Sequence, residues 1–302
     1  MQLISLYSYY NIANFGDALC CRLVELLSGQ KIKHTPIGRA ELSAVGSILF
    51  TGQGAFIKKH PLMSIQTLHD VKSWINNMVS PPMIIWGTGF IKECGEDFVC
   101  PVREMDVKAT RGKLTADIMR RAGVLPPDVE VTYGDPGLLY PMLLDEEVPK
   151  KSFDVGVIPH FIDRVIGAEI ATYLSSKGYA VKLIDVGHKN SLNVVREISA
   201  CCTIISSSLH GLIVADAFGI PNRQMMLSML SADENATVDD YSFKFRDYYS
   251  AYNMEMQPPV TLNEIYENSS CIAEFIERHY NVDMDEVKRV KKSLLSSFPF
   301  PK

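Results

Sequence analysis

Apolar residues along this chain gather in short runs of strand length. In the first half, these runs lie at residues 3–9, 47–56, 83–90 and 105–110. The second half contains four more, at residues 153–160, 180–186, 202–208 and 222–228. Runs that are apolar almost throughout are typical of parallel strands buried on both faces.

The segments between these runs have helical spacing. Leu19 and Leu23 share one face of a helix predicted to start at Asp17, which suits an N-cap or first-turn position. A second helix follows Arg111, and Gly123 is expected to end it. In the second half, helices are predicted at residues 163–177, 191–200 and 209–219.

This strand and helix series occurs twice, which predicts an α/β protein with two Rossmann-like, doubly wound domains facing a cleft. At 302 residues the chain is also long enough for two domains. We place the domains at residues 1–145 and 152–260, with a helical tail at residues 261–302 packing across both. Residues 133–151, rich in turn formers and charge, are predicted to form the linker.

In doubly wound sheets, ligands bind beyond the carboxyl ends of the strands. The segments that follow the predicted strands should therefore lie on one rim. They are residues 11–17, 52–54, 87–89, 110–111, 159–160 and 206–210.

Composition narrows the classes of function. The net charge is −5 and basic residues form no long runs, which argues against a nucleic-acid partner. The seven cysteines are odd in number and lack metal-site spacing, so we expect reduced thiols, no metal and a cytoplasmic protein.

The N-terminal segment lacks the features of a signal peptide, and no run reaches the roughly 18 apolar residues of a membrane span. Association with the inner face of a membrane stays open.

The polar stretch between a buried strand and a buried helix is the strongest candidate site. Unpaired N–H groups at the helix start, together with Ser206, Ser207 and Ser208, suit a phosphate or carboxylate. His210, one residue after Leu209, could exchange a proton with such an anion. A serine N-cap and a histidine bound to backbone groups would explain the same residues without a ligand.

Each of the other candidate residues on the rim has both a functional and a purely structural explanation. Asp17 could be a carboxylate base or a helix cap, and Arg111 could bind an anion or pair with a neighbouring acid. Lys244 lies in an aromatic segment that could close over an anion or form an amphipathic edge. His160, Asn14, Gly54 and Gly89 lie in turns and glycine loops on the same predicted rim, where turn geometry alone would also explain them.

Several motifs in order make the chain resemble the polysaccharide pyruvyl transferase family. They are NFGDAL (14–19), GQGAF (52–56), WGTGF (86–90), TRGKLTADIMRRAG (110–123), GDPGLL (134–139), GVIPH (156–160), SSSLHGLIVADAFGIP (206–221) and KFRDY (244–248). The resemblance covers about residues 1–250. It implies a fold like that of the GT-B glycosyltransferases, with the acceptor on the N-terminal side and the donor on the C-terminal side.

The resemblance also implies an activity. The donor is phosphoenolpyruvate, the acceptor is a hydroxyl pair of a sugar in a surface polysaccharide or its lipid-linked precursor, and the product is a cyclic pyruvate ketal. No further cofactor is needed. In the family, the serine and histidine junction and an arginine bind the donor, which corresponds here to Ser207, Leu209, His210 and Arg111. Several members carry an arginine where this chain has Ser208, so Lys244, Arg246 or Arg223 would have to supply that charge.

Within this interpretation, His210 is the proton donor, Asp17 the base for the acceptor hydroxyl, and His160 the reserve acid. We assign Ser206, Ser207, Ser208, Lys244 and His160 to donor binding, and Asn14, Gly54 and Gly89 to acceptor binding. Two alternatives remain. One is a GT-B glycosyltransferase that uses a nucleotide sugar, and the other is a glycan-binding relative without catalytic activity.

Overall fold

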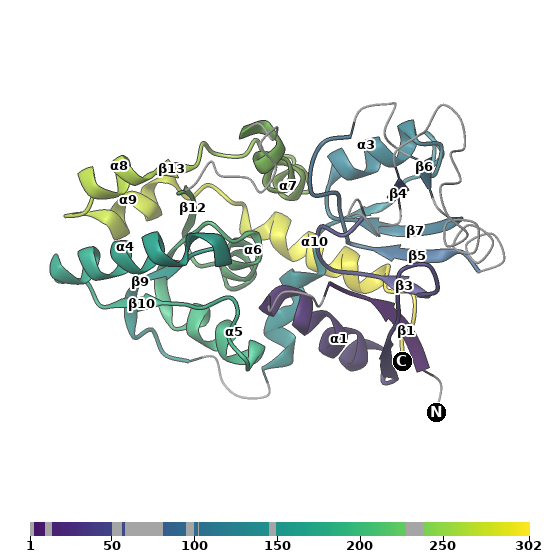
Figure 1. Ribbon diagram of the computed structural model, residues 1–302, viewed down its shortest axis with the longest axis horizontal. Coiled ribbons are helices and arrows are strands. Elements are labelled where there is room, and N and C mark those ends of the chain that lie inside the picture. The colour runs from purple at the N-terminus through teal and green to yellow at the C-terminus, as the bar shows by residue number, and fades with distance from the viewer. Residues whose placement is uncertain are drawn as a thin grey trace, which may run out of the picture.

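The structure, a computed structural model, describes residues 3–9, 14–49, 56–57, 81–94, 100–101, 103–144, 149–227 and 238–302. It contains two parallel β-sheets, one in each half of the chain, with helices packed around them (Figure 1). The predicted α/β class with two parallel sheets is confirmed.

The N-terminal sheet has the strand order β2-β1-β3-β5-β7-β8, and all neighbouring strands in it are parallel. Its strands are β1 (Leu3–Tyr7), β2 (Lys31–His34), β3 (Leu42–Ser43), β5 (Met83–Trp86), β7 (Met105–Thr110) and β8 (Thr132–Tyr133). An antiparallel pair, β4 (Phe56–Ile57) and β6 (Cys100–Pro101), stands apart from this sheet.

The C-terminal sheet has the order β10-β9-β11-β12-β13 and is also parallel. Its strands are β9 (Phe153–Ile158), β10 (Val181–Leu183), β11 (Cys201–Ser206), β12 (Asn222–Met226) and β13 (Val260–Thr261). Because both sheets are parallel, the loops after their strands carry the candidate residues at one edge of each sheet.

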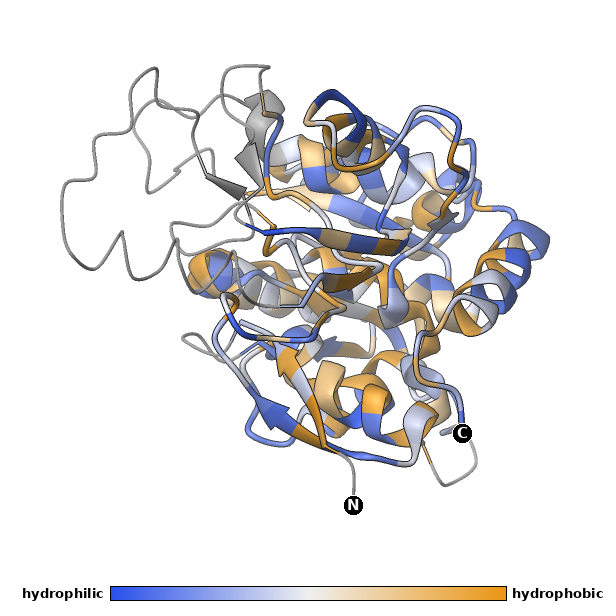
Figure 2. Ribbon diagram, turned by 90° about the vertical axis from the view of Figure 1, so that its right-hand side faces the viewer, coloured by the Kyte–Doolittle hydropathy of each residue, from blue (hydrophilic) through white to orange (hydrophobic). Residues whose placement is uncertain are grey.

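Helices connect and cover the strands. They are α1 (Phe15–Ser28), α3 (Lys113–Arg121), α4 (Arg164–Ser176), α5 (Ser191–Ser199), α6 (Leu209–Phe218), α7 (Val238–Ser250), α8 (Leu262–Glu267), α9 (Ile272–His279) and α10 (Met284–Ser296), with the 3-10 helices η2 (Pro136–Leu143) and η3 (Phe161–Asp163). Figure 2 shows hydrophilic and hydrophobic residues alternating along helices at the surface. No helix in the described part of the chain is both long and apolar enough to cross a membrane.

Two sequence-based predictions differ from the structure. Within the predicted strand 47–56, residues 47–49 are bent or irregular and Phe56 begins the separate strand β4, while β3 lies earlier in the chain. Gly46, three residues after β3, turns the backbone at a φ of +102° and so prevents a strand from continuing through residues 47–49. Strand β2 was not predicted, because this edge strand alternates lysines with apolar or aromatic residues and contains no apolar run.

The segment predicted as a linker is largely buried. Asp135 caps η2, and Leu138, Leu139 and Tyr140 within it are almost fully buried. This 3-10 helix contacts both α1 and α6, so it packs between elements of the two halves. Turn residues in the sequence therefore marked a tight helix rather than an exposed connection. The domain limits themselves stay a prediction.

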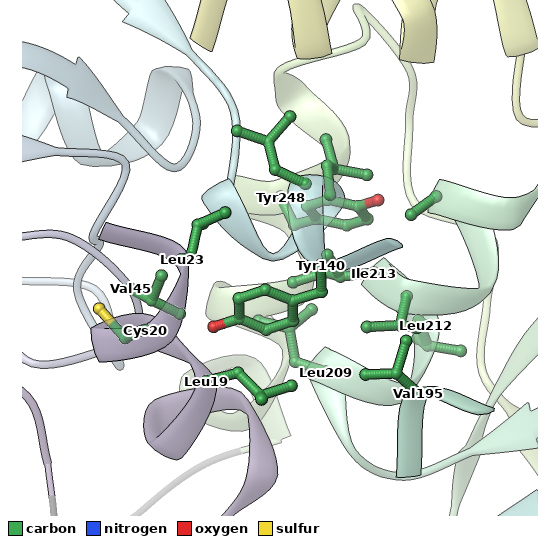
Figure 3. Close-up of a cluster of buried hydrophobic side chains, with 14 of the residues drawn as sticks. Leu19, Cys20, Leu23, Val45, Tyr140, Val195, Leu209, Leu212, Ile213 and Tyr248 are labelled. Carbon is green, nitrogen blue, oxygen red and sulfur yellow. The ribbon is translucent and has the colours of Figure 1, made fainter. Parts of the chain in front are cut away.

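One hydrophobic cluster extends through both halves. It includes Leu19 and Leu23 of α1, Tyr140 of η2, and Leu209 and Ile213 of α6 (Figure 3). Helix α6 is buried on nearly every side, which explains why its sequence is apolar all round. The two halves are thus held together by a continuous apolar core.

The last helix contacts elements of both halves. The Trp86 indole N–H donates to the carbonyl of Leu294 on α10 at 3.1 Å, and the Phe298 ring packs edge-on against the same indole. The Lys291 ammonium donates to the Ala217 carbonyl at the end of α6, at 2.6 Å. Figure 1 shows α10 running between the two sheets.

A buried ion pair attaches α7 to the N-terminal half. The Arg111 Nε–H donates to Asp247 Oδ2 at 2.9 Å, and both side chains are fully buried. Asp247 also accepts from the backbone N–H and the hydroxyl of Thr115, and so caps the start of α3. A Cβ on Gly112 would lie 1.6 Å from the Asp247 carbonyl oxygen, so the two backbones touch.

We expect Asp247→Ala to lower the free energy of unfolding by about 3–5 kcal/mol, because it leaves the Arg111 guanidinium buried without a carboxylate. Urea unfolding followed by circular dichroism measures this. As a control, Glu286→Ala breaks the exposed pair with Arg289 and should change stability little. Equal losses in the two variants would contradict a special role for the buried pair.

Candidate active site

The starts of two helices from different halves meet at the candidate site. His210 is the second residue of α6, and its ring lies directly against Gly16 in the first turn of α1. A Cβ on Gly16 would lie 2.2 Å from His210 Nδ1, so only glycine allows this approach. The Phe15 N–H also donates to the Val186 carbonyl at 2.8 Å, which fixes the start of α1 against the C-terminal half.

The three serines before α6 have different surroundings. Ser206 Oγ accepts the N–H of Ser208 at 3.0 Å and lies 2.8 Å from its carbonyl, so this hydroxyl shapes the turn. Ser207 Oγ accepts the His160 N–H at 2.8 Å and donates to Asp163 Oδ2 at 2.6 Å. Ser208 is the N-cap residue, but its side chain makes no capping hydrogen bond. The start of α6 is therefore not closed by a side chain.

His210 is neutral in this environment. Burial, and then the positive charges of Lys244 and Arg111, lower its pKa to about 3. Its Nε2 atom is buried and has no hydrogen-bond partner in the described part of the chain. A buried ring nitrogen without a partner is costly, which points to a group that is absent from the protein itself.

Asp17 lies in the first turn of α1 and is only 7% exposed. Burial, and then the nearby carboxyl of Asp135, raise its pKa to about 7. Gly46 makes room for this carboxyl, since a Cβ there would lie 2.5 Å from Asp17 Oδ1. A carboxyl that titrates near neutral pH can both accept and donate a proton under physiological conditions.

Asp135 belongs to the same group, and sequence reasoning did not single it out. Its Oδ1 accepts the Gly137 N–H at 2.8 Å, whereas Oδ2 is buried without a partner. Burial raises its pKa to about 6. An aspartate before Pro-Gly indicates only a helix cap, so no local sequence signal connects it with Asp17.

Lys244 is the cation at this site. In the part of the chain that the structure describes, its ammonium has no hydrogen-bond or ion-pair partner, and it lies 5.2 Å from the centroid of the Phe245 ring. Burial, and then the charge of Arg111, lower its pKa to about 8, while Asp163 and Asp17 oppose this shift. Lys244 therefore remains mostly charged at neutral pH.

His160 also responds to Lys244. Burial, followed by the Lys244 charge, lowers its pKa to about 4, and Asp163 partly offsets this. Lys244 thus influences His160, His210 and Asp17 together, so these predicted site residues share one electrostatic environment.

The other predicted residues are placed as follows. The Arg111 guanidinium is held by Asp247, by the Ser47 hydroxyl and by the Phe90 carbonyl, and it lies on Gly89. Its charge nevertheless lowers the pKa of Lys244 and His210. The side chain of Asn14 accepts the Gly16 N–H at 3.0 Å and caps α1.

Leu209 packs into the hydrophobic cluster, so only its backbone belongs to the start of α6 (Figure 3). Gly54 lies outside the described residues. Of the three cations considered as replacements at Ser208, Arg246 approaches Glu93 at 3.6 Å and Arg223 lines a separate cavity. Lys244 is the one coupled to both Asp17 and His210.

Among the described residues, no group of three or more His, Cys, Asp and Glu side chains is arranged to hold a metal ion. The six cysteines whose side chains the structure describes are free thiols.

Comparison with known proteins assigns the chain to a family. A model described as "Polysaccharide pyruvyl transferase" matches residues 14–223, which include most of the site. This chain belongs to the polysaccharide pyruvyl transferase family. The resemblance seen in the sequence motifs is thereby confirmed, and a transferase of this class is indicated.

Two curated proteins are similar to this chain. The uncharacterized protein L143 of Acanthamoeba polyphaga mimivirus is 27% identical over 216 residues, which cover 70% of each chain. The succinoglycan biosynthesis protein ExoV of Rhizobium meliloti (strain 1021) is 28% identical over 145 residues, or 46% of this chain and 40% of ExoV. No solved structure gives a significant match.

Asp17 should make stability depend on pH. Its folded-state pKa of about 7 lies above the ordinary value of 3.8, so ionising it costs stability increasingly as the pH rises between these values. We expect Asp17→Asn to stabilise the protein by up to about 4 kcal/mol at about pH 8 and by little at about pH 4. Urea titrations at both pH values measure the difference. The exposed Asp117→Asn serves as control, and an equal effect of Asp17→Asn at both pH values would refute the raised pKa.

Proposed function

We propose that this protein transfers the pyruvyl group of phosphoenolpyruvate to two hydroxyls of one sugar and forms a cyclic ketal. The sugar belongs to a surface polysaccharide or its lipid-linked precursor. The observation that carries the proposal is the ammonium of Lys244, which has no hydrogen-bond or ion-pair partner among the described residues and is coupled to a buried carboxyl, Asp17, and a buried imidazole, His210. Family membership supports the reaction class.

The donor carries a phosphate and a carboxylate, and the proposed donor site collects positive charge for them. Lys244 supplies a full charge, and the open start of α6 supplies N–H groups and the positive end of the helix dipole. The Ser208 hydroxyl adds a donor where several family members have arginine. Arg111 acts through its charge and by holding α7 rather than through a free guanidinium.

Ketal formation needs two additions to the same carbon. A proton is added to the methylene carbon of the enol, which leaves a cationic centre at the carbon that bears the phosphate. One sugar hydroxyl attacks that carbon, and phosphate departs with the original bonding electrons. The second hydroxyl then closes the ring. The two sugar hydroxyls release two protons in total. One of them replaces the proton that the enzyme added to the methylene carbon, and the second leaves with the phosphate or enters solvent.

We assign proton donation to His210 and proton removal from the acceptor to Asp17, with His160 as the reserve acid. Because His210 is neutral without ligand, it can donate only after the bound phosphate raises its pKa. Donor binding must therefore precede protonation. Asp17, with a pKa near 7, suits the removal of a hydroxyl proton at neutral pH.

The proposed acceptor site lies on the N-terminal side, toward Asn14, Gly54 and Gly89, across a cleft like that of the GT-B enzymes. We propose that the protein acts in the cytoplasm, where phosphoenolpyruvate is available, and approaches the inner face of the membrane when its acceptor is lipid-linked.

Phosphate release from phosphoenolpyruvate tests the function directly. With glycosides that present free 4,6 or 3,4 hydroxyl pairs, we expect acceptor-dependent phosphate and a pyruvylated product detectable by mass spectrometry. Lys244→Met should lower kcat/KM for phosphoenolpyruvate by roughly 10- to 100-fold. Arg246→Met, on the same helix, is the matched control. Stabilisation by nucleotide sugars without any response to phosphoenolpyruvate would reject the proposal in favour of a glycosyltransferase.

Binding of phosphoenolpyruvate should take up a proton at about pH 6, because the bound phosphate raises the pKa of His210. Calorimetric titrations in buffers of different ionisation enthalpy measure this uptake. His210→Gln should retain binding and lose most of the uptake. If the variant takes up as many protons as the natural chain, His210 is not the group that becomes charged.

A further inference from the structure

Another buried cation, Arg223, lies away from the candidate active site. Arg223 on β12 is only 9% exposed, and its Nη2 donates to the Pro258 carbonyl at 2.7 Å. Its Nε and Nη1 atoms are buried, and neither has a hydrogen-bond partner among the residues that the structure describes. In contrast to Arg111, no carboxylate of the described residues forms an ion pair with it.

These unpaired atoms belong to residues that line a small cavity. Its volume is about 20 Å³, and its walls include Asn222, Gln224, Tyr249, Tyr280 and Val282 besides Arg223. That volume holds one water-sized particle and is too small for an organic ligand. Two more wall atoms, Asn222 Oδ1 and Gln224 Oε1, are also buried without partners.

Burial lowers the pKa of the Arg223 guanidinium, and the neighbouring Tyr249 and Glu264 partly offset this. Glu264 is exposed, and no ion pair joins it to Arg223 among the described residues. An arginine cannot release its proton at physiological pH, so the guanidinium remains cationic even though burial lowers its pKa. Burial raises the pKa of the neighbouring Tyr249 well above its ordinary range, so that hydroxyl stays neutral. A buried cation of this kind requires a counter-anion.

We propose that the Arg223 cavity binds a single monatomic anion of the chloride class. The Nε–H and Nη1–H groups would donate to it, while the amide oxygens of Asn222 and Gln224 would bind water at its margin. The anion would connect β12 with α7 through Tyr249. Two exposed residues are the competing counter-ions: Glu264, whose charge acts on Arg223, and Glu255, at the rim of the cavity.

Thermal unfolding of the full chain at equal ionic strength, in sodium chloride, sodium bromide and sodium gluconate, tests the site. We expect either halide to raise the melting midpoint by roughly 2 to 4 °C over gluconate, saturating with concentration. Arg223→Gln should abolish the difference, and Arg164→Gln, which removes an exposed arginine, should retain it. Glu255→Gln should preserve or enlarge the halide effect, and its loss in that variant would overturn the proposal.

A second measurement does not depend on the folding of a variant. Crystals of the natural chain soaked in bromide should show an anomalous peak within hydrogen-bonding distance of Arg223 Nε and Nη1. A peak confirms the site. Ordered water without anomalous signal, or a halide effect that survives in Arg223→Gln, overturns it.

Discussion

The buried ion pair between Arg111 and Asp247 is the contact on which the candidate site depends. Arg111 follows a strand of the N-terminal sheet, and Asp247 lies on α7, which comes from the second half of the chain. Lys244 precedes Asp247 by about one helical turn, so the pair that holds α7 in place also holds Lys244 near Asp17 and His210. Buried pairs of this kind contribute little net stability, but they favour one geometry strongly.

Burial moves the acid and base groups of the site toward neutrality. It lowers the pKa of His160, His210 and Lys244, and it raises the pKa of Asp17 and Asp135. The unliganded site therefore contains few full charges and several unsatisfied polar atoms. A small bound dianion would accept hydrogen bonds from the unsatisfied donors of the site. It would also raise the pKa of His210 and so favour the charged form of that imidazole. Such an arrangement suits a reaction in which the substrate itself activates the acid.

The sequence pattern located most of the polar residues that meet at the site, because loops after parallel strands necessarily share an edge. Asp17, His160, Ser207 and His210 could be found in this way. Asp135 could not, because its sequence context indicates only a helix cap, and its effect on Asp17 arises from burial. The sequence also could not indicate that two nitrogen atoms of Arg223 lack a hydrogen-bond partner among the described residues. That property depends on which side chains the fold places around Arg223.

Local sequence thus determined the α/β class, the parallel sheets, the apolar helix α6 and the family motifs, because these depend on periodicity and on residues close together in the chain. Tertiary structure alone decided that Arg111 is bound by Asp247 and that Lys244 has no hydrogen-bond or ion-pair partner among the described residues. It also decided that most of the 3-10 helix at residues 136–143 is buried. These outcomes depend on contacts between residues far apart in the sequence and on the desolvation that those contacts cause. The spacing of residues along the chain indicates neither these long-range contacts nor the desolvation that they cause.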